Sequence, residues 1–115
     1  MSMRALRVGE LIRNELSLLL HRKVQDPRLG RLLSITRVSV SKDLKHAKVF
    51  VSTIGTEVEK LEVLEGLKAA GSFLRRNLGN TLDLRYTPKL TFYRDDTLEE
   101  AAHVLELMNS VELSE

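Results

Sequence analysis

The sequence predicts an α+β fold, a three-stranded sheet with helices packed on one face. Segments with helical periodicity flank and separate the strand candidates. Two short alternating segments follow one another across a polar turn, as in a hairpin. The chain has 115 residues, 43% of them hydrophobic, which suits one ordinary domain. No break in composition divides it, so we expect a single domain over residues 1–110 and a frayed tail over 111–115.

The first helix is expected from about Leu6 to Lys23, because apolar residues recur on one helical face. Those residues are Val8, Leu11, Ile12, Leu16, Leu19 and Leu20. Asp26–Pro27 is expected to end the helix, since a residue before proline disfavours α-helical backbone, and Gly30 completes the turn.

Two strands are predicted next, joined as a β-hairpin by the polar turn 41–45. The first covers Leu33 to Ser41, but its apolar alternation changes phase, which a β-bulge near Thr36–Arg37 would reconcile. The second strand alternates cleanly, which indicates one buried face, made of Ala47, Val49 and Val51.

A long helical stretch follows and runs to about Leu82. It begins with a capping box, Thr56 with Glu59, and its apolar residues are Leu61, Leu64, Leu67, Ala70, Leu74 and Leu78. A Gly/Ser pair is a typical cause of a helix kink. We therefore expect two helices that meet at a kink, Ala70, Gly71 and Ser72, where exposed N–H groups could also bind anions.

Pro88 introduces a third strand, and Thr97 with Glu100 forms a second capping box that begins the last helix. The apolar face of that helix is Leu98, Ala101, Ala102, Leu105 and Met108. Phe73 and Phe92 are expected in the core. The predicted order is thus α-β-β-α-(kink)-α-β-α, and its α-β-β-α-α-β core matches type II KH-like folds.

The composition excludes several classes of function. Without cysteine there is neither a disulfide framework nor a thiolate site. No apolar run of signal-peptide or bilayer-spanning type occurs, so a soluble cytosolic protein is expected. The histidines (His21, His46 and His103) have no metal-site or catalytic spacing, and no serine lies in a nucleophile elbow, so no enzyme is predicted. The carboxylates Asp95, Asp96, Glu99 and Glu100 are better explained as helix-capping residues than as a metal site.

Charge is unevenly distributed along the chain. Residues 1–48 hold eleven Lys or Arg against four Asp or Glu, whereas residues 97–115 hold five Glu and no Lys or Arg. This asymmetry favours a polyanionic partner over a merely solvated surface. The candidate phosphate-binding residues are Arg4, Arg7, Arg13, Lys42, Lys45, Lys48, Lys68, Arg75 and Arg76.

Aromatic residues are scarce, and two of them face away from the predicted core. Phe50 and Tyr93 could each stack on a base, or could instead cover the sheet against a helix or a partner, which is slightly favoured. The GXXG loop of KH domains is absent, which argues against single-strand recognition by such a loop.

Several ordered motifs resemble those of the bacterial ribosome-binding factor A family, over about residues 4–110. They are Arg7-Val8 with Leu11-Ile12, Asp26-Pro27-Arg28-Leu29, Ser41-Lys42-Asp43-Leu44 followed by Ala47, Val49, Val51 and Ser52, Phe73-Leu74-Arg75, and Leu84 to Phe92 with Asp95. The resemblance implies a type II KH-like fold in which an Ala-x-Gly kink replaces the GXXG loop. Here Ala70-Gly71-Ser72 matches that kink, with its glycine one position early.

The resemblance also implies a function. It predicts a monomeric, non-enzymatic assembly factor that binds the free small (30S) ribosomal subunit or its precursor. Such a factor would assist late maturation of 16S rRNA, including its 5′ end, and support growth in the cold, without a cofactor. The alternative is a protein-interaction or regulatory domain with a basic face and no direct role on RNA, which the scarcity of aromatics favours. A small hydrolase would need a nucleophile and base, which the sequence does not offer.

Overall fold

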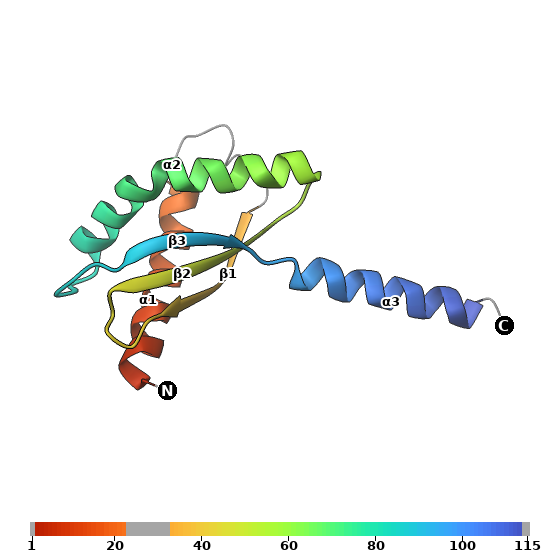
Figure 1. Cartoon of the computed structure of the whole chain (residues 1–115), viewed down its shortest axis with the longest axis horizontal. Coiled ribbons are helices and arrows are strands. Elements are labelled where there is room, and N and C mark those ends of the chain that lie inside the picture. Colours follow the sequence, from red (N-terminus) through yellow and green to blue (C-terminus); the bar gives the residue numbers. More distant parts are fainter. Residues whose placement is uncertain (1, 23–32, 114–115) are drawn as a thin grey trace.

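The structure of the protein is a computed structural model, and it describes residues 2–22 and 33–113. It confirms the α+β class, and its elements follow the KH-like order (Figure 1). They are α1 (Met3–Arg22), β1 (Leu33–Val40), β2 (His46–Thr53), α2 (Glu57–Thr81), β3 (Lys89–Arg94) and α3 (Thr97–Leu113). The turn predicted at Asp26–Pro27 and Gly30 lies outside the described residues.

The sheet has the order β1-β2-β3, with β1 antiparallel and β3 parallel to the central strand. The predicted hairpin is confirmed, and so is its bulge, because the register shifts between Ile35 and Arg37. Thr36 is the extra residue there. Its insertion reconciles the two alternation phases, so Ile35 and the two valines after the bulge all point toward the helices.

The core lies between one face of the sheet and the helices α1 and α2. Its buried residues are Val8, Ile12, Leu16, Leu19, Ile35, Ala47, Val49, Val51, Val63, Leu67, Leu74, Leu78 and Phe92. Leu11, Leu61 and Phe73, which were predicted on buried faces, are exposed. A spacing of three residues advances only 300° on a helix, so a pattern that counts by threes from Leu61 drifts away from the buried side of α2.

The predicted division of α2 into two helices is wrong. One helix of 25 residues runs through Ala70, Gly71 and Ser72, although its axis changes direction along its length (Figure 1). Glycine and serine lower helix propensity without removing a backbone N–H, so they do not break a helix as proline would. Buried leucines on either side, Leu67 and Leu74, hold this segment in the fold.

The last helix does not join the layer of α1 and α2. Figure 1 shows α3 extending away from the sheet, and its residues 100–110 are all exposed. The expectation that its apolar face packs on the sheet is therefore wrong, because α1 and α2 already occupy that side. Thr97 is the first helical residue and Asp96 precedes the helix, so Thr97 is not the N-cap of the predicted second capping box. The helix continues to Leu113, into the segment expected to fray.

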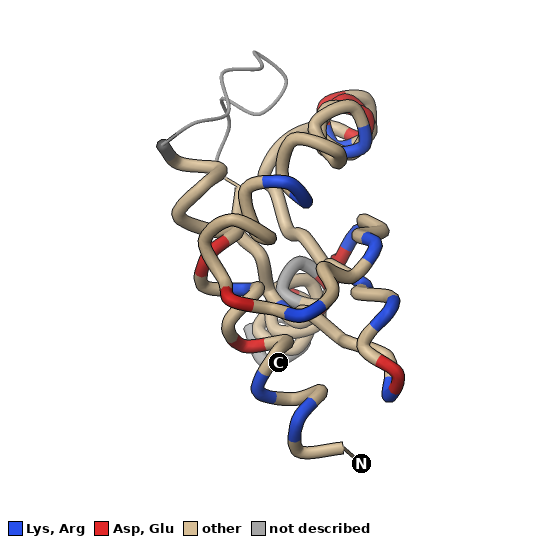
Figure 2. The backbone as a smooth tube through the Cα atoms, turned by 90° about the vertical axis from the view of Figure 1, so that its left-hand side faces the viewer, with Lys and Arg blue, Asp and Glu red and all other residues tan. Residues whose placement is uncertain are grey.

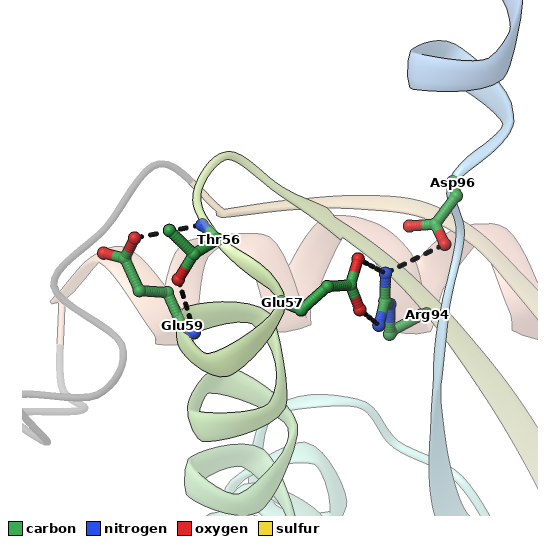
Figure 3. Close-up of polar contacts among 5 residues, drawn as sticks. All are labelled: Thr56, Glu57, Glu59, Arg94 and Asp96. Atoms are coloured by element: carbon green, nitrogen blue, oxygen red, sulfur yellow. Dashed lines mark hydrogen bonds and ion pairs between the residues drawn. The ribbon is translucent and has the colours of Figure 1, made fainter.

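The N-terminus of α2 is fixed by two sets of polar contacts (Figure 3). Thr56 is the N-cap as predicted: its hydroxyl accepts from Glu59 N at 3.2 Å, and Glu59 Oε1 accepts from Thr56 N at 3.0 Å. Arg94 donates to both Glu57 carboxylate oxygens, at 2.6 and 3.0 Å, and to Asp96 at 3.1 Å. The hydrogen bonds from Arg94 lower the pKa of Glu57. These contacts tie the start of α2 to the end of β3.

Candidate nucleic-acid interface

The start of α1 combines positive charge with a helix N-terminus. Ser2 precedes the helix, and its hydroxyl accepts from Ala5 N at 3.3 Å. Arg4 and Arg7 are exposed on the first two turns, and the first turn contains no acidic residue. The helix dipole adds partial positive charge at this end, so the start of α1 favours anions. Farther along, Arg13 is partly neutralised by Glu10, at 3.3 Å.

The hairpin turn presents Lys42 and Lys45 on an ordered loop. Asp43 Oδ1 accepts from Ser41 Oγ at 2.6 Å and from Lys45 N at 3.0 Å, while Ser41 Oγ accepts from His46 N at 3.0 Å. The hydrogen bonds from Ser41 and Lys45 lower the pKa of Asp43. Leu44 has left-handed backbone, with φ of 63°. Both lysines are exposed, so the polar contacts of the turn hold the backbone and leave the cations outward.

The start of α1 and the hairpin are neighbours. A shallow depression joins them, lined by Ser2, Ala5, Leu6, Glu10, Arg37, Val38, Ser39, Val40 and Lys42. We call the four exposed cations of these two segments (Arg4, Arg7, Lys42 and Lys45) the basic end. Figure 2 views the molecule from this side and shows Lys and Arg positions beside the N-terminus, with Asp and Glu positions interspersed among the basic ones. Of the nine predicted cations, these four lie on adjacent segments.

The predicted cations of α2 have different surroundings. Lys68 and Arg76 are exposed, but Arg75 donates from Nε and Nη2 to Thr87 O, at 3.2 and 3.0 Å. Thr87 also rests on Gly79, where an added Cβ would lie 2.7 Å from its hydroxyl oxygen. Arg75 therefore anchors the loop before β3, a role that the sequence pattern did not reveal.

The kink offers no anion site. Because α2 is continuous, the N–H groups of Ala70, Gly71 and Ser72 lie inside a helix instead of at its start. Among residues 2–22 and 33–113, no atom comes within 4 Å of a Cβ built on Gly71, apart from its chain neighbours and the helix's own nearby backbone, so no other described element approaches it. The expectation of exposed N–H groups at this position is wrong.

The sheet face opposite the core carries the remaining predicted residue, Lys48. Phe50 and Tyr93 lie on the same face and stack on each other, with ring centroids 5.6 Å apart. Arg37, which was not among the predicted site residues, places its guanidinium carbon 4.3 Å from the Phe50 ring centroid. Phe50 is the register partner of Arg37 on β2. This pairing could be predicted from the sequence only after the bulge had been placed.

Asp95 supports the capping interpretation of the carboxylates near α3. Asp95 Oδ1 accepts from Thr97 N at 3.0 Å, and Thr36 Oγ1 donates to Asp95 Oδ2 at 2.6 Å. These hydrogen bonds, with that from Thr36 the stronger influence, lower the pKa of Asp95 to about 2. Within residues 2–22 and 33–113, no group of His, Cys, Asp or Glu could hold a metal ion. The same described residues include no helix long and apolar enough to span a bilayer.

Comparison with known proteins identifies the family. The model of the family "Ribosome-binding factor A" matches residues 4–108. The chain belongs to the ribosome-binding factor A family. It is 47% identical to the ribosome-binding factor A of Acetivibrio thermocellus over 103 residues, which cover 90% of this chain and 84% of that protein. The relative from Halothermothrix orenii is 46% identical over 97% of this chain and 91% of its own length.

Solved structures of this family share the fold. A solution structure of a Thermotoga maritima protein described as ribosome-binding factor A has a TM-score of 0.72 and 31% identity, covering 84% of this chain and 92% of that one. For the Thermus thermophilus crystal structure the TM-score is 0.70 and the identity 26%, over 78% of this chain and 93% of that one. A homology model of the Thermus thermophilus factor, fitted into a cryo-EM map of a 30S complex, has a TM-score of 0.59 at 24% identity, covering 84% of this chain and 96% of that one.

The two adjacent arginines of α2 should differ in their effect on stability. We expect Arg75→Gln to lower the free energy of unfolding by about 1 kcal/mol, because it removes two charge-assisted hydrogen bonds to Thr87 O. Arg76→Gln removes the same charge from an exposed site and should stay within about 0.5 kcal/mol of the wild type. Urea denaturation measures both. Equal stabilities of the two variants would contradict the anchoring role.

Acid should weaken the fold through Asp95. Its pKa is about 2 in the folded chain, below the value of about 3.9 for an unperturbed aspartate. Ionised Asp95 therefore stabilises the fold above about pH 4, and this contribution is lost as the pH falls toward about 2. Asp95→Asn should lower Tm at pH 7 and reduce the drop in Tm between pH 7 and pH 2. Asp83→Asn, at an exposed site in the loop after α2, is the matched control. An unchanged pH dependence in Asp95→Asn would contradict this assignment.

Proposed function

We propose that this protein binds the free small (30S) ribosomal subunit or its precursor in the cytoplasm. Membership of the ribosome-binding factor A family, shown by the match over residues 4–108, carries the proposal. The Thermus thermophilus homology model fitted into a map of a 30S complex is consistent with it, although that similarity concerns the fold alone. The basic end supplies cations suited to rRNA phosphates.

We further propose that the bound protein acts as a monomer and assists late maturation of 16S rRNA, including its 5′ end, and that it supports growth in the cold. The role is binding and not catalysis, since the family is named for binding and not for a reaction. The observed surface suits such a role, because the cations of the basic end lie on ordered segments that could fix the orientation of the protein on RNA.

Sedimentation tests the proposal directly. The purified protein should co-sediment with isolated small subunits and should not co-sediment with large subunits or 70S ribosomes. Cells that lack it should grow poorly in the cold and accumulate 16S rRNA with an unprocessed 5′ end. Absence of binding to both mature and precursor small subunits would contradict the proposal. Binding that survives removal of accessible rRNA by RNase would instead favour a protein-interaction domain.

A further inference from the structure

The open face of the sheet is a second cationic surface, which meets the basic end at β1, where Arg37 and Ser39 also line the depression. Residues that alternate with the core positions point away from the helices, and they include Arg37, Ser39, Lys48, Phe50, Thr91 and Tyr93. None of the residues in β1, β2 or β3 is an aspartate or a glutamate. Asp95, just after β3, is already engaged by Thr36 and Thr97. The open face is therefore positively charged and has no aliphatic patch at its centre.

Two aromatic rings form a stack at the middle of this face. Phe50 and Tyr93 are register partners on adjacent strands, with an interplanar angle of 27° and centroids 5.6 Å apart. Tyr93 remains 41% exposed despite this stacking. Arg37 covers Phe50 from β1, so the stack runs from its guanidinium through Phe50 to Tyr93. The planar guanidinium of Arg37 and its N–H groups can also bind a further planar or anionic group.

The chemistry of the open face indicates which class of macromolecule it can bind. A protein surface would call for aliphatic contacts, which the centre of the face lacks. A duplex would not fit either, because its bases are stacked inside the helix and unavailable to the rings. Single-stranded RNA supplies both elements that the face can bind, exposed bases for the rings and phosphates for the cations. Positive charge without a strand carboxylate is complementary to that partner.

We propose that the open sheet face binds a single-stranded RNA segment, with a base stacked on Tyr93, whose ring is backed by Phe50, and neighbouring phosphates held by Arg37 and Lys48. This inference rests on the proposed function and adds a contact to it, since an rRNA precursor offers single-stranded segments beside the duplex regions. The basic end and the open face then bind different features of the same RNA.

Tyrosine fluorescence provides the test, because the chain has no tryptophan and only two tyrosines. Tyr86→Phe leaves Tyr93 as the only tyrosine, and Tyr86 itself is exposed in the loop before β3. We expect single-stranded octauridylate to quench the Tyr93 emission of this variant saturably. An RNA hairpin whose stem holds the same number of nucleotides should quench it much less.

The affinity of each variant for labelled octauridylate tests the same site. Tyr93→Leu with Phe50→Leu keeps apolar volume but removes the rings, and should weaken binding roughly tenfold or more. Tyr93→Phe should bind as the wild type does. Arg37→Gln keeps both rings and should also weaken binding, so it tests the site even if the double leucine variant folds poorly. Arg85→Gln removes one cation from the loop before β3, at the opposite end of that strand from Tyr93, and is the control with unchanged affinity.

The outcomes separate this inference from the proposed function. Octauridylate binding that is unaffected by Arg37→Gln and does not quench Tyr93 would overturn the inference, even if the protein sediments with small subunits. A drop in subunit binding for the Leu variant without any effect on octauridylate would overturn it in favour of a protein contact. A wild type that binds octauridylate through Tyr93 but does not bind subunits would overturn only the proposed function.

Discussion

Neutralising the basic end should weaken binding to small subunits by on the order of a hundredfold at about 0.1 M salt. The variant replaces Arg4, Arg7, Lys42 and Lys45 with Gln. Each lost phosphate contact retains counterions that binding would otherwise release. The dependence of log K on log salt should therefore become shallower by roughly 0.7 to 0.9 for each contact removed. Sedimentation at several salt concentrations measures both effects.

A control variant of equal net charge separates the effect of where the cations lie from the effect of net charge. Converting Ala101, Ala102, Asn109 and Ser110 to Glu places four negative charges on the exposed helix α3. Both variants change the formal net charge from +2 to −2. The control should bind much more tightly than the Gln variant, because its new charges lie on a helix that extends away from the basic end (Figure 1). Equal losses would show that net charge alone governs binding, and an unaffected Gln variant would exclude the basic end as the interface.

The sequence predicted local structure well wherever neighbouring residues determine it. Thr56 and Glu59 form the expected capping box, because both partners lie within one helical turn. The bulge was predictable from the change of phase between Ile35 and Val38, since side chains on a strand alternate strictly. These features need no knowledge of which segments meet in space.

Long-range contacts explain what the sequence could not predict. The partner of Arg75 is a backbone carbonyl twelve residues away, and no side-chain pattern marks a carbonyl as an acceptor. The apolar face of α3 was predicted to pack, but packing needs a vacant surface, and α1 and α2 occupy the available face of the sheet. The distribution of charge along the sequence predicted nine phosphate-binding cations. Only the fold shows that Arg4 and Lys42 lie on adjacent segments, whereas Lys48 lies on the sheet face opposite the core.

Alanine substitution at two helical glycines should change the free energy of unfolding in opposite directions. An added Cβ at Gly9 would lie 2.8 Å from Val38 O, a backbone carbonyl of the edge strand β1, so either α1 or β1 must shift. Such overpacking costs about 1–3 kcal/mol, against a gain of up to about 1 kcal/mol in helix propensity. Gly9→Ala should therefore lower the free energy of unfolding by up to about 2 kcal/mol. Chemical denaturation at neutral pH measures the change.

Gly71→Ala is the matched variant, because it makes the same chemical change where no described residue outside the helix's own backbone lies within 4 Å of the added Cβ. It should raise the free energy of unfolding by about 0.5–1 kcal/mol, since alanine restricts the unfolded chain and suits a helix interior. The result also decides what causes the change of direction in α2. If Gly71→Ala destabilises the protein, the bend depends on the glycine itself. If it stabilises the protein, the packing of Leu67 and Leu74 on the sheet directs the helix, and the small residues between them merely tolerate its course.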